Sequence, residues 1–143
     1  HNAYHASSAL RPEASALSTD ACVPISRLAE CVSATAKDIE ASGMIGPIVG
    51  HVGDGNFHVL LLVDTKNPEE IITAEAIIGR LAKRAIEMDG TCTGEHGIGQ
   101  GKQKYMQQEH GNALALMQAI KSALDPNNIL NPGKIWPQPF PTS

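Results

Sequence analysis

Apolar residues recur at three- and four-residue steps in two long segments of the chain, which is the spacing of an amphipathic helix. The first segment runs from Pro24, whose fixed φ suits the first turn of a helix, to Gly43, which supplies a stop. The second runs from Asn67 to Gly90. Its asparagine is a favoured N-cap, a proline follows it, and Glu70 stands at the capping-box position. The pattern therefore predicts two amphipathic helices.

Two short runs rich in apolar and β-branched residues, 48–52 and 57–63, lie between these helices. The sequence that separates them, Gly-Asp-Gly-Asn at 53–56, supplies the positive φ angles that a tight reversal needs. We therefore expect a β-hairpin. Near the N-terminus, residues 19–23 have the composition of a short strand that leads into the first helix, although the first twenty residues carry no sustained period.

Beyond the second helix, residues 91–101 hold four glycines in eleven positions and follow neither a helical nor a strand period. We expect a loop whose backbone approaches another group closely. Shorter helices are expected at about 102–109 and 113–124, followed by a proline-rich coil from Asn131. Because strands and helices interleave, the pattern is typical of the α+β or α/β class, and we favour α+β, with helices packed on one face of an antiparallel sheet.

The composition is that of a globular protein of ordinary size. The chain has 143 residues, the length of one domain, of which 42% are hydrophobic and 18% charged. No stretch is long and apolar enough to cross a bilayer, and a net charge of -4 with scattered lysines and arginines argues against a nucleic-acid partner. The three cysteines form no C-x-x-C pair, so we expect reduced thiols. Because the chain begins with His1 and not Met, we expect it to be part of a longer polypeptide.

Two histidines flank the predicted reversal, His51 near the end of the first strand and His58 near the start of the second. A hairpin would bring both imidazoles together, which makes half of a metal site. Glu95 and His96, in the glycine-rich loop, are the obvious source of a third ligand. Two histidines and one carboxylate bind zinc or another first-row divalent ion and leave positions open for a substrate, as catalytic sites do.

The alternative interpretation is structural. His51 and His58 would then be core histidines bonded to backbone carbonyls, and Asp54 and Asn56 would serve only the turn and not support metal ligands. Arg27, in the first turn of the first helix, is either a partner for a substrate carboxylate or a solvated helix-end arginine. Spacing alone does not choose between these interpretations.

Three motifs, taken together and in order, resemble the C-terminal domain of FAD-linked oxidases of the vanillyl-alcohol oxidase type. They are G-H-V-G-D-G-N-F-H at 50–58, T-G-E-H-G-I-G at 93–99 and L-D-P-N-N-I-L-N-P-G-K at 124–134. Within that family the likeness is to cytochrome-type D-lactate dehydrogenases, because the opening H-N-A and the segment S-T-D-A-C-V-P-I-S-R-L at 18–28 also resemble them. The resemblance covers nearly the whole chain.

The resemblance implies that residues 1–143 are the substrate and metal domain, a ferredoxin-like cap with a C-terminal helical segment, and that an N-terminal domain binding most of the FAD is absent. It also implies that His51, His58 and Glu95 bind the metal and that His96 is the general base. Asn131 would lie against the isoalloxazine ring, although a simple turn explains its N-P-G-K context as well.

The implied reaction is metal-assisted oxidation of a D-2-hydroxyacid such as D-lactate, with transfer of a hydride to FAD. A zinc, manganese or iron ion would lower the pKa of the substrate hydroxyl, and an imidazole suits the proton transfer because it titrates near neutrality. The implied electron acceptors are cytochrome c, a quinone or an electron-transfer flavoprotein. Without the flavin domain the isolated chain is expected to be inactive. Two rival functions stay open, a stand-alone metal-dependent hydrolase and an inert metal-binding domain.

Overall fold

The computed structural model describes Ala6 and residues 9–136, which form parts of two compact units, His1–Glu95 and His96–Ser143. The opening His1–Ala3 motif and the end of the proline-rich tail lie outside the described residues. Within the described part, no helix combines the length and the apolar character that a membrane span requires.

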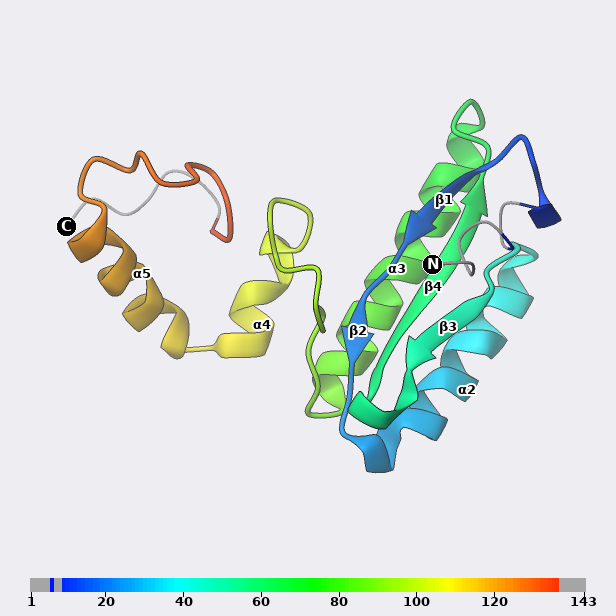
Figure 1. The fold of residues 1–143 in the computed structure, drawn as a ribbon, viewed down its shortest axis with the longest axis horizontal. Coiled ribbons are helices and arrows are strands. Elements are labelled where there is room, and N and C mark those ends of the chain that lie inside the picture. The colour runs from blue at the N-terminus through cyan, green and yellow to red at the C-terminus, as the bar shows by residue number, and fades with distance from the viewer. Residues whose placement is uncertain (1–5, 7–8, 137–143) are drawn as a thin grey trace. The chain divides into compact units, whose positions relative to one another are not determined.

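The first unit is built around one long strand, β4 (Asn56–Val63), which pairs antiparallel with three shorter strands (Figure 1). On one edge lie β1 (Ser15–Ser18) and then β2 (Ala21–Cys22), and on the other lies β3 (Ile48–His51). The predicted hairpin is confirmed. Its reversal includes a short 3-10 turn, η1 (Val52–Asp54), that ends at Gly55 with φ of 74°.

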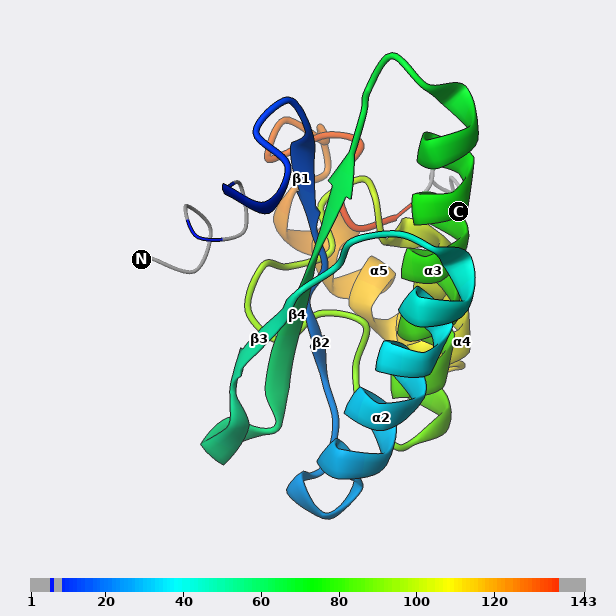
Figure 2. The ribbon, with the colours of Figure 1, turned by 90° about the vertical axis from the view of Figure 1, so that its right-hand side faces the viewer.

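Both predicted helices are confirmed, α2 (Ile25–Ser42) and α3 (Pro68–Glu87), and they cover the same face of the sheet (Figure 2). The predicted stop at Gly43 is observed, because this residue adopts a left-handed conformation and its N–H donates to Glu40. The fold is therefore α+β with an antiparallel sheet and helices on one face, as the sequence predicted.

The N-terminus of α3 departs in one detail from the predicted capping box. Asn67 caps the helix by accepting from the N–H of Glu69 at 3.1 Å. The carboxylate of Glu70 accepts instead from the N–H of Asp64 at 2.9 Å and from Arg11 at 2.8 Å. The backbone N–H of Asn67 is bonded to the carbonyl of Asp64 at 2.9 Å, so it does not need the glutamate.

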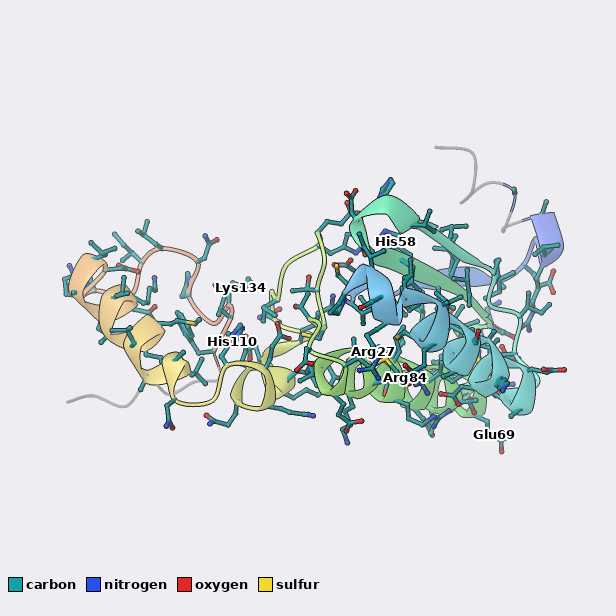
Figure 3. All side chains as sticks on the ribbon, turned by 90° about the horizontal axis from the view of Figure 1, so that it is seen from below. Arg27, His58, Glu69, Arg84, His110 and Lys134 are labelled. Atoms are coloured by element: carbon teal, nitrogen blue, oxygen red, sulfur yellow. The ribbon has the colours of Figure 1, made fainter. Side chains whose placement is uncertain are left out.

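The alternation of side chains along β4 decides where functional residues lie. Every second residue belongs to the core beneath the helices: Phe57, Val59, Leu61 and Val63. The intervening side chains, including His58, point to the other face of the sheet. Figure 3 accordingly shows His58 on the sheet, in a different layer from Arg84 of α3. The core thus lies between the helices and one face of the sheet, and the opposite face, which carries His58, is where a site can be built.

Up to Trp136, where the described residues end, the second unit contains three short helical elements, η2 (Gln103–Tyr105), α4 (Met106–His110) and α5 (Ala113–Leu124). They correspond to the two helices that the sequence predicted in this region. The glycine-rich loop and the segment after α5 are joined here, since the N–H of Ile135 donates to the carbonyl of Gly99 at 2.7 Å.

Candidate metal site

The two histidines of the hairpin lie close together. In the β3–β4 register Val49 faces His58, so His51, two residues further along, is its diagonal neighbour on the same face. The ring centroids are 6.4 Å apart and the ring planes are perpendicular. His58 is buried, whereas His51 is exposed. The hairpin therefore presents one fixed imidazole and one with freedom to adjust.

The buried ring of His58 has a defined tautomer. Its Nδ1 lies 2.9 Å from the carbonyl oxygen of Thr19. A carbonyl oxygen only accepts hydrogen bonds, so Nδ1 carries the hydrogen and donates it. In the neutral ring this leaves the lone pair on Nε2 as the outward-facing atom, which is how metal-binding histidines are commonly oriented.

Glu95 supplies the third group, from the loop that follows α3. Its Oε1 lies 3.0 Å from Nε2 of His58. If Nε2 carries a lone pair, two acceptors face each other at this distance, and they need a positive partner between or beside them. A proton on the ring is one such partner and a metal ion is the other.

The donor set fits a first-row divalent cation. One ligand atom from each of His51, His58 and Glu95 lies within 4.8 Å of the other two. Zinc ligands lie about 2.0–2.2 Å from the ion in a tetrahedral arrangement, so two of them are about 3.3–3.6 Å apart. The 3.0 Å between His58 and Glu95 therefore has to widen by a few tenths of an ångström when an ion binds. Because His51 and Glu95 are exposed, their side chains have room to complete the coordination.

The loop that carries Glu95 is held against the sheet at several points. Thr91 and Cys22 form an antiparallel bridge through two backbone hydrogen bonds of 2.8 and 3.2 Å. Gly94 packs directly on the side chain of Asn56, because a Cβ on this glycine would lie 2.7 Å from Cγ of the asparagine. The expectation that this glycine-rich segment approaches another group closely is therefore confirmed at Gly94.

The other candidates occupy varied positions. Asn56 is buried, and its Oδ1 has no hydrogen-bond partner among the described residues. Arg27 is bonded to Glu30 at 2.9 Å, which agrees with a solvated helix-end arginine. Burial, with the charges of Asp20 and Asp54, raises the pKa of the Cys22 thiol. In the described part no cysteine forms a disulfide; Cys31 and Cys92 are buried and Cys22 is half-buried.

His96 and Asn131 belong to the second unit. His96 is exposed and directly follows Glu95 in the chain. Asn131 is exposed, has φ of 48°, and accepts from the N–H of Lys134 at 3.3 Å. The turn that its sequence context favours is therefore present.

Sequence reasoning overlooked the segment that joins β1 to β2. Thr19 orients His58, and Asp20 accepts hydrogen bonds from Thr93 and from the backbone of Glu95, each at 2.9 Å. A signal was available, because an aspartate within the strand-like run at 19–23 needs a partner if it is buried. Its partners, however, are more than seventy residues away.

Comparison with known proteins places the chain in a family. Residues 1–135 match the family described as FAD linked oxidases, C-terminal domain. A probable mitochondrial D-lactate dehydrogenase of Danio rerio is 49% identical over 136 residues, covering 94% of this chain and 27% of the relative. The mitochondrial D-lactate dehydrogenase [cytochrome] 1 of Saccharomyces cerevisiae is 48% identical over 82% of this chain and 20% of the relative.

More distant relatives share the same region. A glycolate oxidase subunit, GlcD, of Bacillus subtilis is 41% identical over 82% of this chain and 25% of the relative. Among solved structures, 4-ethylphenol oxidase from Gulosibacter chungangensis, in an isoeugenol complex, has a similar fold, with a TM-score of 0.65 and 22% identity over 92% of this chain and 26% of that one. The chain spans about a quarter of the length of these relatives. The match over residues 1–135 shows that the chain belongs to the family of FAD-linked oxidase C-terminal domains.

Proposed function

We propose that this chain is the metal- and substrate-binding portion of a flavin-dependent D-2-hydroxyacid dehydrogenase that acts on D-lactate or a similar acid. The observation that carries the proposal is that Nε2 of His58 lies 3.0 Å from Oε1 of Glu95, while Nδ1 of the same ring donates to the carbonyl of Thr19. The relatives named D-lactate dehydrogenase and glycolate oxidase subunit support the substrate class.

In this proposal His51, His58 and Glu95 hold a zinc, manganese or iron ion. Such an ion supplies Lewis acidity at the hydroxyl and carboxylate of the substrate, and bound FAD supplies the acceptor for the α-hydrogen with its electron pair. The hairpin fixes the ring of His58 and the loop is anchored to the sheet, so only the side chains of His51 and Glu95 have to adjust, which limits the entropic cost of orienting the substrate.

His96 is proposed to accept the proton of the substrate hydroxyl. An imidazole near neutral pH accepts and releases a proton without a large energetic penalty. Its position next to Glu95 ties it covalently to the third metal ligand. Asn131, in the turn of the N-P-G-K motif, is proposed to contact the flavin ring, whereas most FAD contacts would come from another part of a longer polypeptide that includes this chain as its C-terminal domain. Electrons would then pass to cytochrome c, a quinone or an electron-transfer flavoprotein.

Histidine and glutamate variants of the flavin-containing polypeptide test this function. We expect His51→Ala and Glu95→Ala to abolish D-lactate-dependent reduction of a dye while the visible absorption of FAD is unchanged, because only the substrate side is altered. His110→Ala is the matched control, since His110 lies outside the cluster, 3.9 Å from Glu109, and should retain activity.

Turnover that survives in the His51→Ala variant would refute the metal role. A colourless polypeptide that cleaves esters or peptides would instead support a metal-dependent hydrolase, in which the metal activates water.

A further inference from the structure

Asp20 is a buried carboxylate directly behind the proposed metal ligands. Its side chain has no exposed surface, which is costly for a charge unless hydrogen bonds compensate it. Its Oδ2 accepts from the hydroxyl of Thr93 and from the backbone N–H of Glu95, both at 2.9 Å. Its Oδ1 lies 3.9 Å from Nδ1 of His58. One carboxylate therefore lies against two of the three segments that bring the proposed ligands, β4 and the loop after α3.

These contacts join segments that are far apart in the sequence. Asp20 lies between β1 and β2, His58 lies on β4, and Glu95 lies on the loop after α3. Within the loop, the backbone of Thr93 bonds to the hydroxyl of Thr91. The hydroxyl of Thr93 donates to Asp20, outside the loop. Without the bond from the Glu95 N–H to Asp20, the backbone at the third ligand would lose the acceptor that fixes its distance from the sheet.

We propose that Asp20 is a positioning residue of this site: it holds Glu95 opposite His58 and places a negative charge behind the His58 ring. The inference rests on the proposed metal-binding function. Asp20 would act in two separable ways. Its hydrogen bond from the Glu95 N–H sets the position of the loop, and its negative charge raises the basicity of the His58 imidazole, as a carboxylate behind a ligating imidazole does.

Substitutions of Asp20 separate the two effects. In Asp20→Asn the amide oxygen still accepts from Thr93 and Glu95, but the negative charge is lost. In Asp20→Ala both effects are lost. Thr93→Val removes one hydrogen bond and leaves the carboxylate and the Glu95 N–H in place. Asp38→Asn is the matched control, because Asp38 is a largely buried carboxylate of the same unit that pairs with Arg80 and Arg84 and belongs to neither β4 nor the loop.

The experiment is a titration of the 143-residue chain and its variants with Co²⁺ alone, followed by the visible absorption of the bound ion. Replacing groups that orient metal ligands commonly weakens binding about 10- to 100-fold. We expect a loss near the upper end of this range for Asp20→Ala, a loss near the lower end for Asp20→Asn, and unchanged affinity for Asp38→Asn. We also expect faster hydrogen exchange of the Glu95 amide in Asp20→Ala, measured without metal.

The outcomes separate a failure of the role of Asp20 from a failure of the proposed metal-binding function. Tight binding by the unmodified chain together with unchanged affinity in folded Asp20→Ala and Asp20→Asn would overturn the role of Asp20 alone. If the unmodified chain and His58→Ala bind Co²⁺ equally weakly, the metal site is refuted, and the role of Asp20 is refuted with it. If neither Asp20 variant folds, Thr93→Val decides: weakened Co²⁺ binding supports the role, and affinity equal to that of the unmodified chain refutes it.

Discussion

Replacing Gly94 with alanine should displace Glu95 through a single steric contact. A Cβ at this position would lie 2.7 Å from Cγ and 2.7 Å from Oδ1 of Asn56. Carbon atoms in favourable contact are about 3.5–4.0 Å apart, so the loop or the asparagine must move by nearly an ångström. Asn56 is buried between β2 and β3, where it faces Cys22 and His51. The loop is therefore the part that yields.

The expected cost follows from this geometry. Overpacking of a well-packed region typically costs about 1–3 kcal/mol, and we expect a loss of stability in this range. Because Glu95 directly follows Gly94, we also expect Co²⁺ affinity to fall at least about tenfold, the lower end of what disturbed ligand orientation produces. Gly53→Ala is the matched control, since nothing lies within 4 Å of a Cβ there and its φ is not positive. A surface change of this kind should stay within about 0.5 kcal/mol.

The assay must report on the first unit. The only tryptophan of the chain, Trp136, belongs to the second unit, so its fluorescence reports on the unfolding of the second unit and not of the first. Hydrogen exchange of the β4 amides under native conditions gives the stability of the sheet instead. If Gly94→Ala matched Gly53→Ala both in β4 protection and in Co²⁺ affinity, the close packing of Gly94 on Asn56 would have no energetic consequence, and the expected displacement of Glu95 would be refuted.

Two further predictions concern stability. Hydrogen bonds from Arg11 and from the N–H of Asp64 lower the pKa of Glu70 from 4.5 to about 2. The stability that the Glu70 carboxylate contributes is therefore present above about pH 4.5 and is lost as the pH falls towards 2. Glu70→Gln should therefore flatten the pH dependence of urea unfolding between about pH 5 and about pH 3, and an unchanged profile would contradict the role of Arg11. Thr19→Val should destabilise the sheet by about 1–3 kcal/mol, because the buried N–H of Val59 donates to the Thr19 hydroxyl at 2.8 Å and would lose this acceptor; β4 exchange rates equal to those of the unmodified chain would contradict it.

The sequence predicted the elements whose signals are local. Both long helices carry their own start and stop residues, and the hairpin carries its turn, so α2, α3 and the β3–β4 pair were all expected. The convergence of His51 and His58 followed from the hairpin alone. These features require no knowledge of contacts between distant segments, and for that reason pattern and turn chemistry suffice.

Other features depend on long-range pairing and were not predicted. β1 has the sequence Ser-Ala-Leu-Ser, which shows no strand signal, and it is a strand because it pairs with residues 60–63 of β4. Tertiary context often overrides weak strand propensity in this way. Asp20 was overlooked for the same reason, since its partners Thr93 and Glu95 are 73 and 75 residues away along the chain.

The proposed metal site combines one fixed side chain with two adjustable ones, and this division has a consequence for metal binding. His58 is buried and its ring is held by Thr19, whereas His51 and Glu95 are exposed. The backbone of Glu95 is nevertheless restrained by Asp20, so only its side chain has to reorganise. A bound ion would link β3, β4 and the loop after α3, and ligand binding to the folded state raises stability with ligand concentration. The gain should therefore appear mainly as slower exchange at residues 91–95, because β4 is already protected by the core on its other face.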